Sequence, residues 1–433
     1  MAIHRRKVLG AISLVAAASL LLSGCSGNDG GDGGSVTLTL WHNTQDPQAV
    51  LDMYAAYEKE SGNKIELVPI TSDGFEDATL TKWASGDRPD ILEFHATSDY
   101  VMQLNPSENL NSLDGMDFIK ASGSLYDLGG RGADGKVYAA ITNFPEVWGL
   151  YYNKKLLADN GLQPAKTLDD LAKQCEVLNK AGITMLAEGG GSLWPLVAIS
   201  LTAASSYAPN GYGKSVAEKK AALNDAGSPL VKALTEYKKL IDANCAVKDI
   251  TTATFENSVD RVYSGQAVYQ AIHSNIAPVY LDAAGGDAKK LSDTVGFTAF
   301  GAEKQSTFVN PGPIGTYFVP KTGNAAKEKA AKEFIEFITG EYNQTYINNS
   351  GTFPILEGIN DPSDAGGLML DIKKAYDDGP MVKNFADGVP GGLGPIITLM
   401  SELVVGQKTP QQVADAVQKN AETAAKAQGL AGW

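Results

Sequence analysis

Strand patterns and helix patterns alternate along this chain from residue 36 onward. Apolar residues and threonines take turns between residues 36 and 41, which indicates a strand with one buried face. Asp46 followed by Pro47 predicts the start of a helix, because aspartate caps free amides and proline suits the first helical position. Further strands are predicted at 64–70 and 90–94, with a short helix between them. This order predicts an α/β fold with a doubly wound sheet, in which ligands bind beyond the carboxyl ends of the strands.

A second block with the same alternation begins near Leu150. Thr167 and Asp170 predict a capped helix, and apolar residues at helical spacing predict another helix at 229–243. A strand pattern returns at 295–300, and helix patterns follow toward the C-terminus. Because 433 residues suffice for two domains of ordinary size, the chain is predicted to form two α/β units.

Residues 1–24 have the pattern of an export signal, with a basic start and then an apolar run too short to span a bilayer comfortably. The sequence LSGC that ends at Cys25 resembles the bacterial lipobox, which predicts cleavage before Cys25 and lipid on its thiol. Arg5 and Arg6 also fit the twin-arginine pattern, so export in the folded state is an alternative route. Residues 25–35 are rich in glycine and aspartate and predict a flexible tether.

The composition sets limits on the partners of the chain. Its hydrophobic content of 43% and charged content of 20% are typical of a globular protein. The formal charge of −14 becomes −17 once the three basic residues of the signal are removed. This excess of negative charge repels polyanions and argues against nucleic acid or anionic lipid as a partner. No later run of apolar residues is long enough to predict a membrane span.

Several short stretches together suggest a family. They are GDRPDI at 86–91, DGKVYA at 134–139, LYYNKKLLADNGL at 150–162, TLDDL at 167–171, GGSLWPL at 190–196, SGQAVY at 264–269, AAKEFIEFI at 330–338 and GTFP at 351–354. In this order the stretches resemble the family 1 extracellular solute-binding proteins of the maltodextrin-binding type. Members of that family are the substrate-binding lipoproteins of sugar ABC transporters.

The resemblance implies a two-lobed fold of the type II periplasmic-binding-protein class. Each lobe would be a sheet flanked by helices, and a hinge that the chain crosses more than once would join the lobes. Lobe 1 would hold residues 36–144 and 303–348, and lobe 2 would hold residues 145–302 and 349–433. The lobes would close on a ligand held between them.

Carbohydrate sites need aromatic faces against the sugar ring and planar polar groups for its hydroxyls. Trp194 matches the family's tryptophan before proline and is predicted to be a stacking platform, with a core tryptophan as the alternative. Glu146 falls where relatives place a sugar-binding glutamate, and its alternative role is a solvated hinge carboxylate. Trp148, two residues further on, would be either a wall of the site or a strut of the hinge.

Histidines and amides follow several predicted strands. His42 and Asn43 follow the first strand, and His95 follows the strand at 90–94, so these residues are predicted to face the ligand. His273 comes two residues before Asn275, which stands where relatives often carry a tryptophan that stacks on sugar. The asparagine removes one expected aromatic ring and leaves the identity of the sugar open.

Four residues in neighbouring loops are lesser candidates for ligand contact, namely Asp73, Phe75, Asn310 and Tyr317. The three histidines that follow the signal could in principle hold zinc, but their spacing shows no ligand motif. No metal and no cofactor is therefore predicted.

An anionic ligand would favour arginine side chains, because the guanidinium fork matches carboxylate and phosphate. Outside the signal only Arg88, Arg131 and Arg261 are present, and none falls in a predicted cleft loop. A neutral sugar is therefore preferred over a phosphorylated solute. The acidic balance would also suit a polyamine.

Cys175 and Cys245 are the cysteines that remain once Cys25 carries lipid. An exported protein lives where disulfides persist, and both residues would lie in lobe 2, so a bridge between them is feasible. Cys175 also lies on an apolar helix face, where a buried free thiol is common. The sequence leaves both states open.

Together these features predict the extracytoplasmic substrate-binding component of an ABC importer. It would be a monomer, anchored to the bacterial cell membrane through Cys25, that captures a small oligosaccharide and delivers it to the membrane subunits without catalysis. The alternatives are a glycerol-phosphate or polyamine binding protein of the same fold, a glycoside-cleaving lipoprotein with two carboxylates, and a surface adhesin for polymers.

Overall fold

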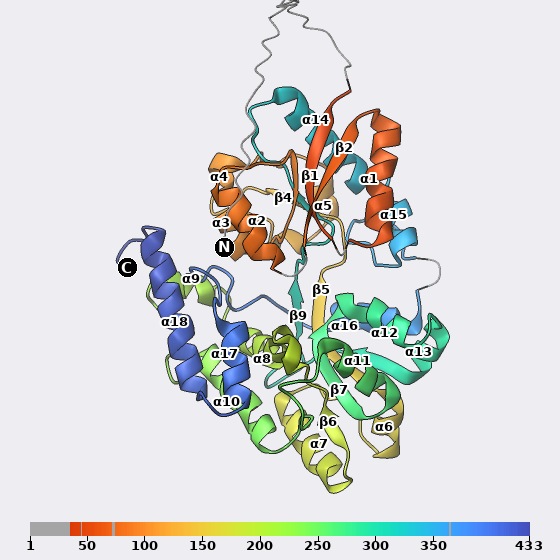
Figure 1. Ribbon diagram of the computed structural model, residues 1–433, viewed down its shortest axis with the longest axis vertical. Helices are drawn as coiled ribbons and strands as arrows, with labels where there is room; N and C mark the ends of the chain where they lie inside the picture. Colours follow the sequence, from red (N-terminus) through yellow and green to blue (C-terminus); the bar gives the residue numbers. More distant parts are fainter. Residues whose placement is uncertain (1–34, 45, 72–73, 363–364) are drawn as a thin grey trace, which may run out of the picture. The chain divides into compact units, whose positions relative to one another are not determined.

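The computed structural model describes residues 35–44, 46–71, 74–362 and 365–433 of the chain. The predicted export signal, Cys25 and nearly all of the predicted tether lie outside the described residues, and so does Asp73. Within the described residues the strands form two sheets, whose members are labelled in Figure 1.

The first sheet combines strands from the N-terminal part of the chain with one much later strand. Its order is β2-β1-β3-β10-β4, with bounds Lys64–Ile70, Thr37–Asn43, Ile91–Glu93, Thr316–Phe318 and Ala139–Ile141. β1 is parallel to both β2 and β3, whereas β10 is antiparallel to β3 and β4, between which it lies. The strands predicted near 36–41, 64–70 and 90–94 are confirmed.

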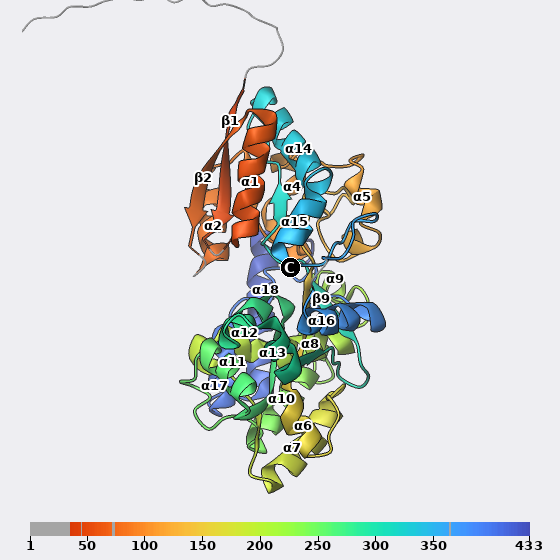
Figure 2. The ribbon, with the colours of Figure 1, turned by 90° about the vertical axis from the view of Figure 1, so that its right-hand side faces the viewer.

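Helices from the N-terminal part of the chain and from residues 325–350 belong to the half of the first sheet. Their bounds are α1 Gln48–Ser61, α2 Phe75–Ala84, α3 Ser98–Gln103, α4 Pro106–Asn109, α5 Phe118–Ala121, α14 Ala325–Thr339 and α15 Asn343–Ser350. Figure 2 shows α1, α14 and α15 packed beside one another near β1. Val50, Tyr54 and Tyr57 share one face of α1 and are buried in the core of this half.

The start of α1 corrects one prediction. Pro47, not Asp46, occupies the N-cap position, and no side chain caps the helix. The Asp46 carboxylate instead contacts His42, with 3.1 Å between Oδ2 and Nδ1. A nearby polar partner thus outcompetes the free amides of the helix for this carboxylate.

The second sheet is built around one long strand, β5. The order is β11-β9-β5-β7-β6, and β8 also pairs with β5; the bounds are β5 Glu146–Asn153, β6 Thr184–Leu186, β7 Ala267–His273, β8 Val295–Thr298, β9 Thr307–Asn310 and β11 Met381–Val382. β5 is antiparallel to β7, β8 and β9. Trp148 and residues 150–152 are therefore paired on both sides, which fixes the register of the strand.

Many helices cover this second sheet. Their bounds are α6 Lys154–Asp159, α7 Leu168–Lys180, α8 Ala198–Tyr207, α9 Tyr212–Ala217, α10 Pro229–Asp242, α11 Phe255–Ser264, α12 Ala277–Ala283, α13 Ala288–Thr294, α16 Gly367–Asp378, α17 Ile396–Val404 and α18 Pro410–Ala427. The predicted capping box at the start of α7 is confirmed, since the side chains of Thr167 and Asp170 each accept from the other's backbone amide. None of the helices within the described ranges is both long and apolar enough to cross a membrane.

The chain passes between the two sheets at several points in the described residues. It leaves the first sheet after β4, enters the second at β5, and returns from β9 to β10 through the segment 310–316, which we call the hinge loop. It passes again after α15, because Tyr346 packs in the first core whereas Leu368 of α16 packs in another. The two-sheet α/β architecture with repeated crossings agrees with the predicted fold class.

The residue limits predicted for the two lobes stay a prediction. The strand pairing bears on one of them, because β9 lies within the segment 303–348 expected in lobe 1 and yet pairs with β5 and β11 of the second sheet. The crossing toward the first sheet thus comes after Asn310.

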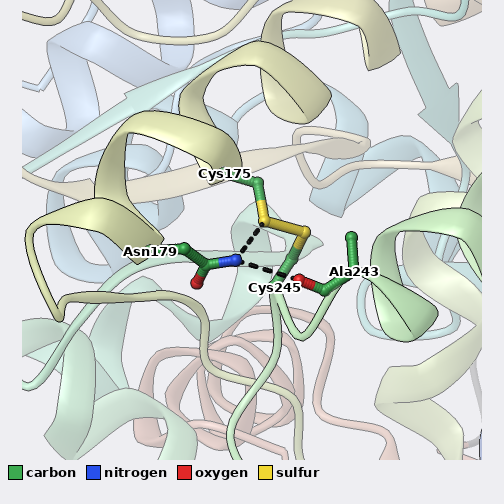
Figure 3. Close-up of a disulfide and its surroundings, with 4 residues drawn as sticks. All are labelled: Cys175, Asn179, Ala243 and Cys245. Carbon is green, nitrogen blue, oxygen red and sulfur yellow. Dashed lines mark hydrogen bonds between the residues drawn. A yellow bond between two sulfur atoms is a disulfide. The ribbon is translucent and has the colours of Figure 1, made fainter.

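A disulfide joins α7 to the chain that follows α10. Cys175 and Cys245 are bonded, with 5.5 Å between their Cα atoms, and both are buried (Figure 3). The side-chain amide of Asn179 donates to Sγ of Cys175 at 3.4 Å and to the carbonyl of Ala243 at 2.9 Å. This amide therefore holds the two linked segments together as well.

The double substitution C175S/C245S is expected to lower the free energy of unfolding by roughly 4 kcal/mol. The bridge spans 70 residues, and a crosslink of that span removes much of the entropy of the unfolded chain. Chemical denaturation of both proteins with and without reductant measures the effect. Reductant should destabilise the wild type alone. An equal denaturation midpoint for wild type and variant without reductant would contradict the expectation.

Candidate ligand-binding site

The register of β5 gathers polar and aromatic side chains on one face of the second sheet. Glu146 pairs with Asn310, and Trp148 pairs with Phe308 on one side and His273 on the other. Residues two apart on a strand share a face, and so do directly paired residues. These five side chains consequently lie on the same face, next to the hinge loop.

Trp194 adds an indole from outside the sheet. It lies in a short 3-10 helix, Trp194–Val197, and its ring centroid is 5.7 Å from that of His273 and 5.3 Å from that of Phe255. The rings of Trp148 and His273 are 5.2 Å apart, and those of Trp148 and Phe308 are 5.7 Å apart. We call these five residues, Trp148, Trp194, Phe255, His273 and Phe308, the aromatic face.

Two polar atoms in the aromatic face have no partner among the described residues. Trp148 Nε1 and His273 Nδ1 are buried, and neither makes a hydrogen bond. A buried polar atom without a partner is costly, so it calls for a water or a ligand. Burial lowers the pKa of His273, although the nearby Glu146 acts in the opposite direction. The lowered pKa favours the neutral ring, which has one donor and one acceptor.

Glu146 lies against the hinge loop. Its side chain is mostly buried, and Oε2 accepts a long hydrogen bond of 3.5 Å from the amide of Asn310. A β-carbon on Gly312 would stand only 2.8 Å from Oε1 of Glu146, so a larger residue there would displace the carboxylate. The carboxylate is thus held between the aromatic face and the hinge loop.

A second group of predicted residues lies at the carboxyl edge of the first sheet. The backbone amide of Asn43 donates to Oε2 of Glu93 at 3.0 Å, and the amide of Gly315 donates to Oε1 at 3.1 Å. Glu93 is fully buried, and burial followed by the neighbouring Asp46 carboxylate raises its pKa well above the ordinary value. One carboxyl group therefore ties the end of β1 to the hinge loop.

His95 follows β3, as predicted, and packs beside α2 and α3. Its Nε2 is 2.8 Å from Oε1 of Glu76, and its ring stacks on Tyr100 with 4.8 Å between centroids. Nδ1 of His95 is buried and makes no hydrogen bond within the described residues. His42 is also mostly buried and contacts Asp46.

The lesser candidates differ in how much surface they present. Phe75 is 1% exposed and packs against Phe94 in the first core, and Tyr317 is fully buried with its hydroxyl 3.0 Å from that of Tyr54. Neither side chain faces solvent in this structure. Asn275 is half-buried in a short 3-10 helix directly after β7, close in sequence to His273.

The hinge loop connects the two groups. Its residue Gly315 bonds Glu93 on the first sheet, and its carbonyl accepts from both the amide and the hydroxyl of Thr142, at 2.8 and 2.9 Å. Its residue Gly312 stands against Glu146. The hinge loop therefore contacts Glu93 on the first sheet and Glu146 on the second, and it is bonded at Thr142 to the segment by which the chain first crosses between the sheets.

Each arginine in the described ranges has its guanidinium engaged away from the aromatic face. Arg88 lies over the ring of Trp83 at 3.8 Å, and Arg131 donates to the carbonyls of Tyr126 and Gly135. Arg261 forms a two-pronged pair with Asp249 at 2.9 and 2.7 Å. None of these groups is available there to hold an anion.

Two surface hollows lie outside the aromatic face. One of about 440 Å³ is lined by residues that include Lys219, Glu422 and Trp433, and one of about 270 Å³ by residues that include Arg131 and Asp387. Neither contains a residue of the aromatic face. Across the described parts of the chain, no group of three or more potential ligand side chains is arranged to hold a metal.

Sequence reasoning did not anticipate four contributors to this region, Phe255, Phe308, Glu93 and Asp46 as a site residue. Phe255 is the first residue of α11 and follows its capping residue, Thr254, which is the one local sign that fixes its position. Phe308 becomes a neighbour of Trp148 only through the pairing of distant strands.

Comparison with known proteins identifies the family of this chain. Residues 52–367, well over half of the chain, match the family described as bacterial extracellular solute-binding protein. The chain belongs to this family. Membership confirms that the molecule is a binding protein rather than an enzyme and that it is of an extracellular class.

Solved structures of similar fold include a chitin oligosaccharide binding protein, with 24% identity, a TM-score of 0.74 and coverage of 91% of this chain and 100% of the other. A sugar transporter protein of Bacillus licheniformis in complex with stachyose has 21% identity, a TM-score of 0.69 and coverage of 90% and 99%. These likenesses confirm the two-lobed fold of the solute-binding protein.

A relative in sequence is YcjN of Escherichia coli (strain K12), which is named as an ABC transporter periplasmic-binding protein. It is 26% identical over 170 residues, which span 37% of this chain and 38% of YcjN. The aligned part is thus well under half of the length of either protein.

Glu188 is a buried acid close to the aromatic face of this solute-binding protein. It precedes the glycine-rich loop 189–191 that leads to Trp194, and it is 5% exposed. Burial raises the pKa of Glu188 to about 8, although the Tyr237 hydroxyl favours the charged form. The neutral acid is therefore the stable form inside the folded protein near neutral pH.

The free energy of unfolding is expected to fall as the pH rises from about 4.5 to about 8. Between these values the unfolded chain releases the proton of Glu188 while the folded protein keeps it. The variant E188Q should lack this part of the pH dependence. At pH 8 its free energy of unfolding should exceed that of the wild type by on the order of 3 kcal/mol.

Denaturation of wild type and E188Q at a series of pH values measures this difference. E236Q serves as the matched control, because Glu236 lies on the surface of α10 and pairs with Lys239. A difference between wild type and E188Q that stays constant with pH would contradict the expectation.

Proposed function

We propose that this protein is the extracytoplasmic substrate-binding component of an ABC importer and that it captures a neutral oligosaccharide at the aromatic face. The observation that carries the proposal is the aromatic face itself, with the buried carboxylate of Glu146 beside it. Indole and imidazole rings cover the apolar side of a pyranose, while a carboxylate accepts from its hydroxyls.

The unpartnered atoms fit the same ligand. Trp148 Nε1 can only donate a hydrogen bond, whereas Nδ1 of a neutral His273 can donate or accept. A sugar hydroxyl is both donor and acceptor, so one such group could satisfy either atom. We assign Trp194 as the stacking platform and Trp148, Glu146 and Asn310 as the polar and apolar wall beside it.

The group on the first sheet would complete the site from the other lobe. His42, Asn43 and His95 lie at the carboxyl ends of β1 and β3, which is where ligands bind in sheets of this kind. We propose that a sugar bridging both groups stabilises the closed form, because it makes more contacts there than in the open form. In this proposal the second segment of lobe 1 begins after Asn310.

Charge supports a neutral ligand over an anionic one. The described arginines make their contacts elsewhere, and the aromatic face contains the imidazole of His273, whose pKa burial lowers, with the carboxylate of Glu146 beside it. A phosphorylated solute would meet Glu146 without a compensating guanidinium. The printed names of the similar structures, a chitin oligosaccharide binding protein and a stachyose complex, also favour an oligosaccharide.

Delivery completes the proposed function. Lipid on Cys25 would hold the protein at the outer surface of the cell membrane, and the tether of residues 25–35 would let the monomer reach the membrane subunits of the importer. The closed form would dock there and release its sugar.

The screen for this function is a thermal shift assay with chitin oligosaccharides, stachyose, glycerol phosphate and a polyamine. A neutral oligosaccharide is expected to raise the Tm, because a ligand bound only by the folded state stabilises it. W194A should weaken the affinity for that sugar at least tenfold by calorimetry, since it removes the platform.

W433A is the matched control for this variant. Trp433 is also partly buried, but it contacts Lys219 and the carbonyl of Ala217, outside the aromatic face. Unchanged affinity in W194A would disprove the platform assignment. A shift with the polyamine or glycerol phosphate alone, or the release of hydrolysis products from an oligosaccharide, would overturn the proposed function.

A further inference from the structure

The residue before Trp194 has an unusual backbone conformation. Leu193 has φ of 62° and ψ of −62°, which lies outside the left-handed helical region and matches a strained three-residue turn. The other non-glycine residues with positive φ in the described ranges are Asn105, Lys219 and Asn244, so Leu193 is the only apolar one among them. A β-carbon makes this conformation unfavourable.

The surrounding chain holds Leu193 in this conformation from both sides. Its amide donates to the carbonyl of Gly190 at 3.1 Å, and its carbonyl accepts from Leu196 at 3.2 Å. The preceding glycine loop is fixed by the bond from Gly191 to the carbonyl of Ala253 at 2.8 Å. A β-carbon on Gly190 would come within 2.2 Å of the carbonyl oxygen of Ile250, so the loop lies close against that backbone.

Core packing of the Leu193 side chain does not offset this strain. The side chain of Leu193 is 39% exposed and belongs to none of the hydrophobic cores, although it is a large apolar group. Its neighbour Trp194, in contrast, packs against the core at Phe255 and His273. The strained backbone is unfavourable in the free protein, and contact of the exposed isobutyl group with a ligand would offset it.

We propose that Leu193 is a ligand-contact residue that widens the apolar surface of Trp194. This inference rests on the proposed function, because it takes the ligand to be the oligosaccharide that stacks on Trp194. The exposed isobutyl group directly precedes Trp194 of the aromatic face in the chain, and in the complex it packs against the apolar side of a sugar ring. Leu193 thereby contributes to the choice among oligosaccharides.

Two substitutions separate the side chain from the backbone. L193A removes the isobutyl group and keeps the strain, whereas L193G removes both, because glycine adopts positive φ freely. L193A is expected to weaken binding of the best sugar from the screen roughly tenfold. L193G should weaken binding at least as much, and its unliganded Tm should exceed that of L193A.

The control is L370A. Leu370 is also an exposed leucine of the second half, at 52%, but it lies in the regular helix α16. It should retain the wild-type affinity. Titration calorimetry with stachyose and chitin oligosaccharides measures the affinities, and thermal unfolding without sugar measures the strain.

The outcomes distinguish this inference from the proposed function. If the wild type binds a sugar and L193A binds it equally well, the inference is overturned while the proposed function stands. An L193G Tm at or below that of L193A removes the strain argument and also overturns the inference. If the wild type binds none of the sugars, the proposed function fails and the inference fails with it.

Discussion

The antiparallel pairing of β5 with β7 and β9 determines which side chains meet at the candidate site. Because β5 has a partner on each side, a slip of one residue would turn Glu146 and Trp148 to the opposite face. The same pairing brings His273 and Phe308 to either side of Trp148, and it places Asn310 at the start of the hinge loop. The site therefore depends on sheet formation more than on any loop.

The first sheet is coupled to this arrangement through one buried carboxyl group. Glu93 accepts from the end of β1 and from the hinge loop, so the end of the strand that carries His42 and Asn43 shares an anchor with the segment that faces Glu146. Burial raises the pKa of this carboxyl group, and two backbone amides hold its two oxygens. The ligand groups of both halves are thus positioned relative to the same short stretch of chain.

Sequence patterns predicted the local structure of the molecule well. The helix caps at Thr167 and the apolar face of α1 depend on residues a few positions apart, so they were visible in the sequence. Asp46 failed as a cap because its partner, His42, belongs to the preceding strand rather than to the helix. A spacing rule for helix ends does not weigh such a competitor.

Long-range neighbours were harder to predict. Glu146, Trp148 and Trp194 were singled out from a family resemblance, whereas Phe308 and Phe255 join them only through strand pairing and helix packing. The state of Cys175 and Cys245 was left open for the same reason, because it depends on the distance between α7 and the end of α10. Burial likewise separates Tyr317 and Phe75 from partly exposed candidates such as Trp194 and Asn310, and burial is set by the whole fold.

The position of β10 has a consequence for the order of folding. β10 lies between β3 and β4, although about 175 residues separate it from β4 along the chain. During synthesis from the N-terminus, β3 and β4 must wait with unpaired edges until residues 316–318 emerge. By then the chain that forms most of the second sheet is already available. The first sheet thus begins to form early but cannot be completed until residues 316–318 are available, and its open edges expose the nascent chain to aggregation in the meantime.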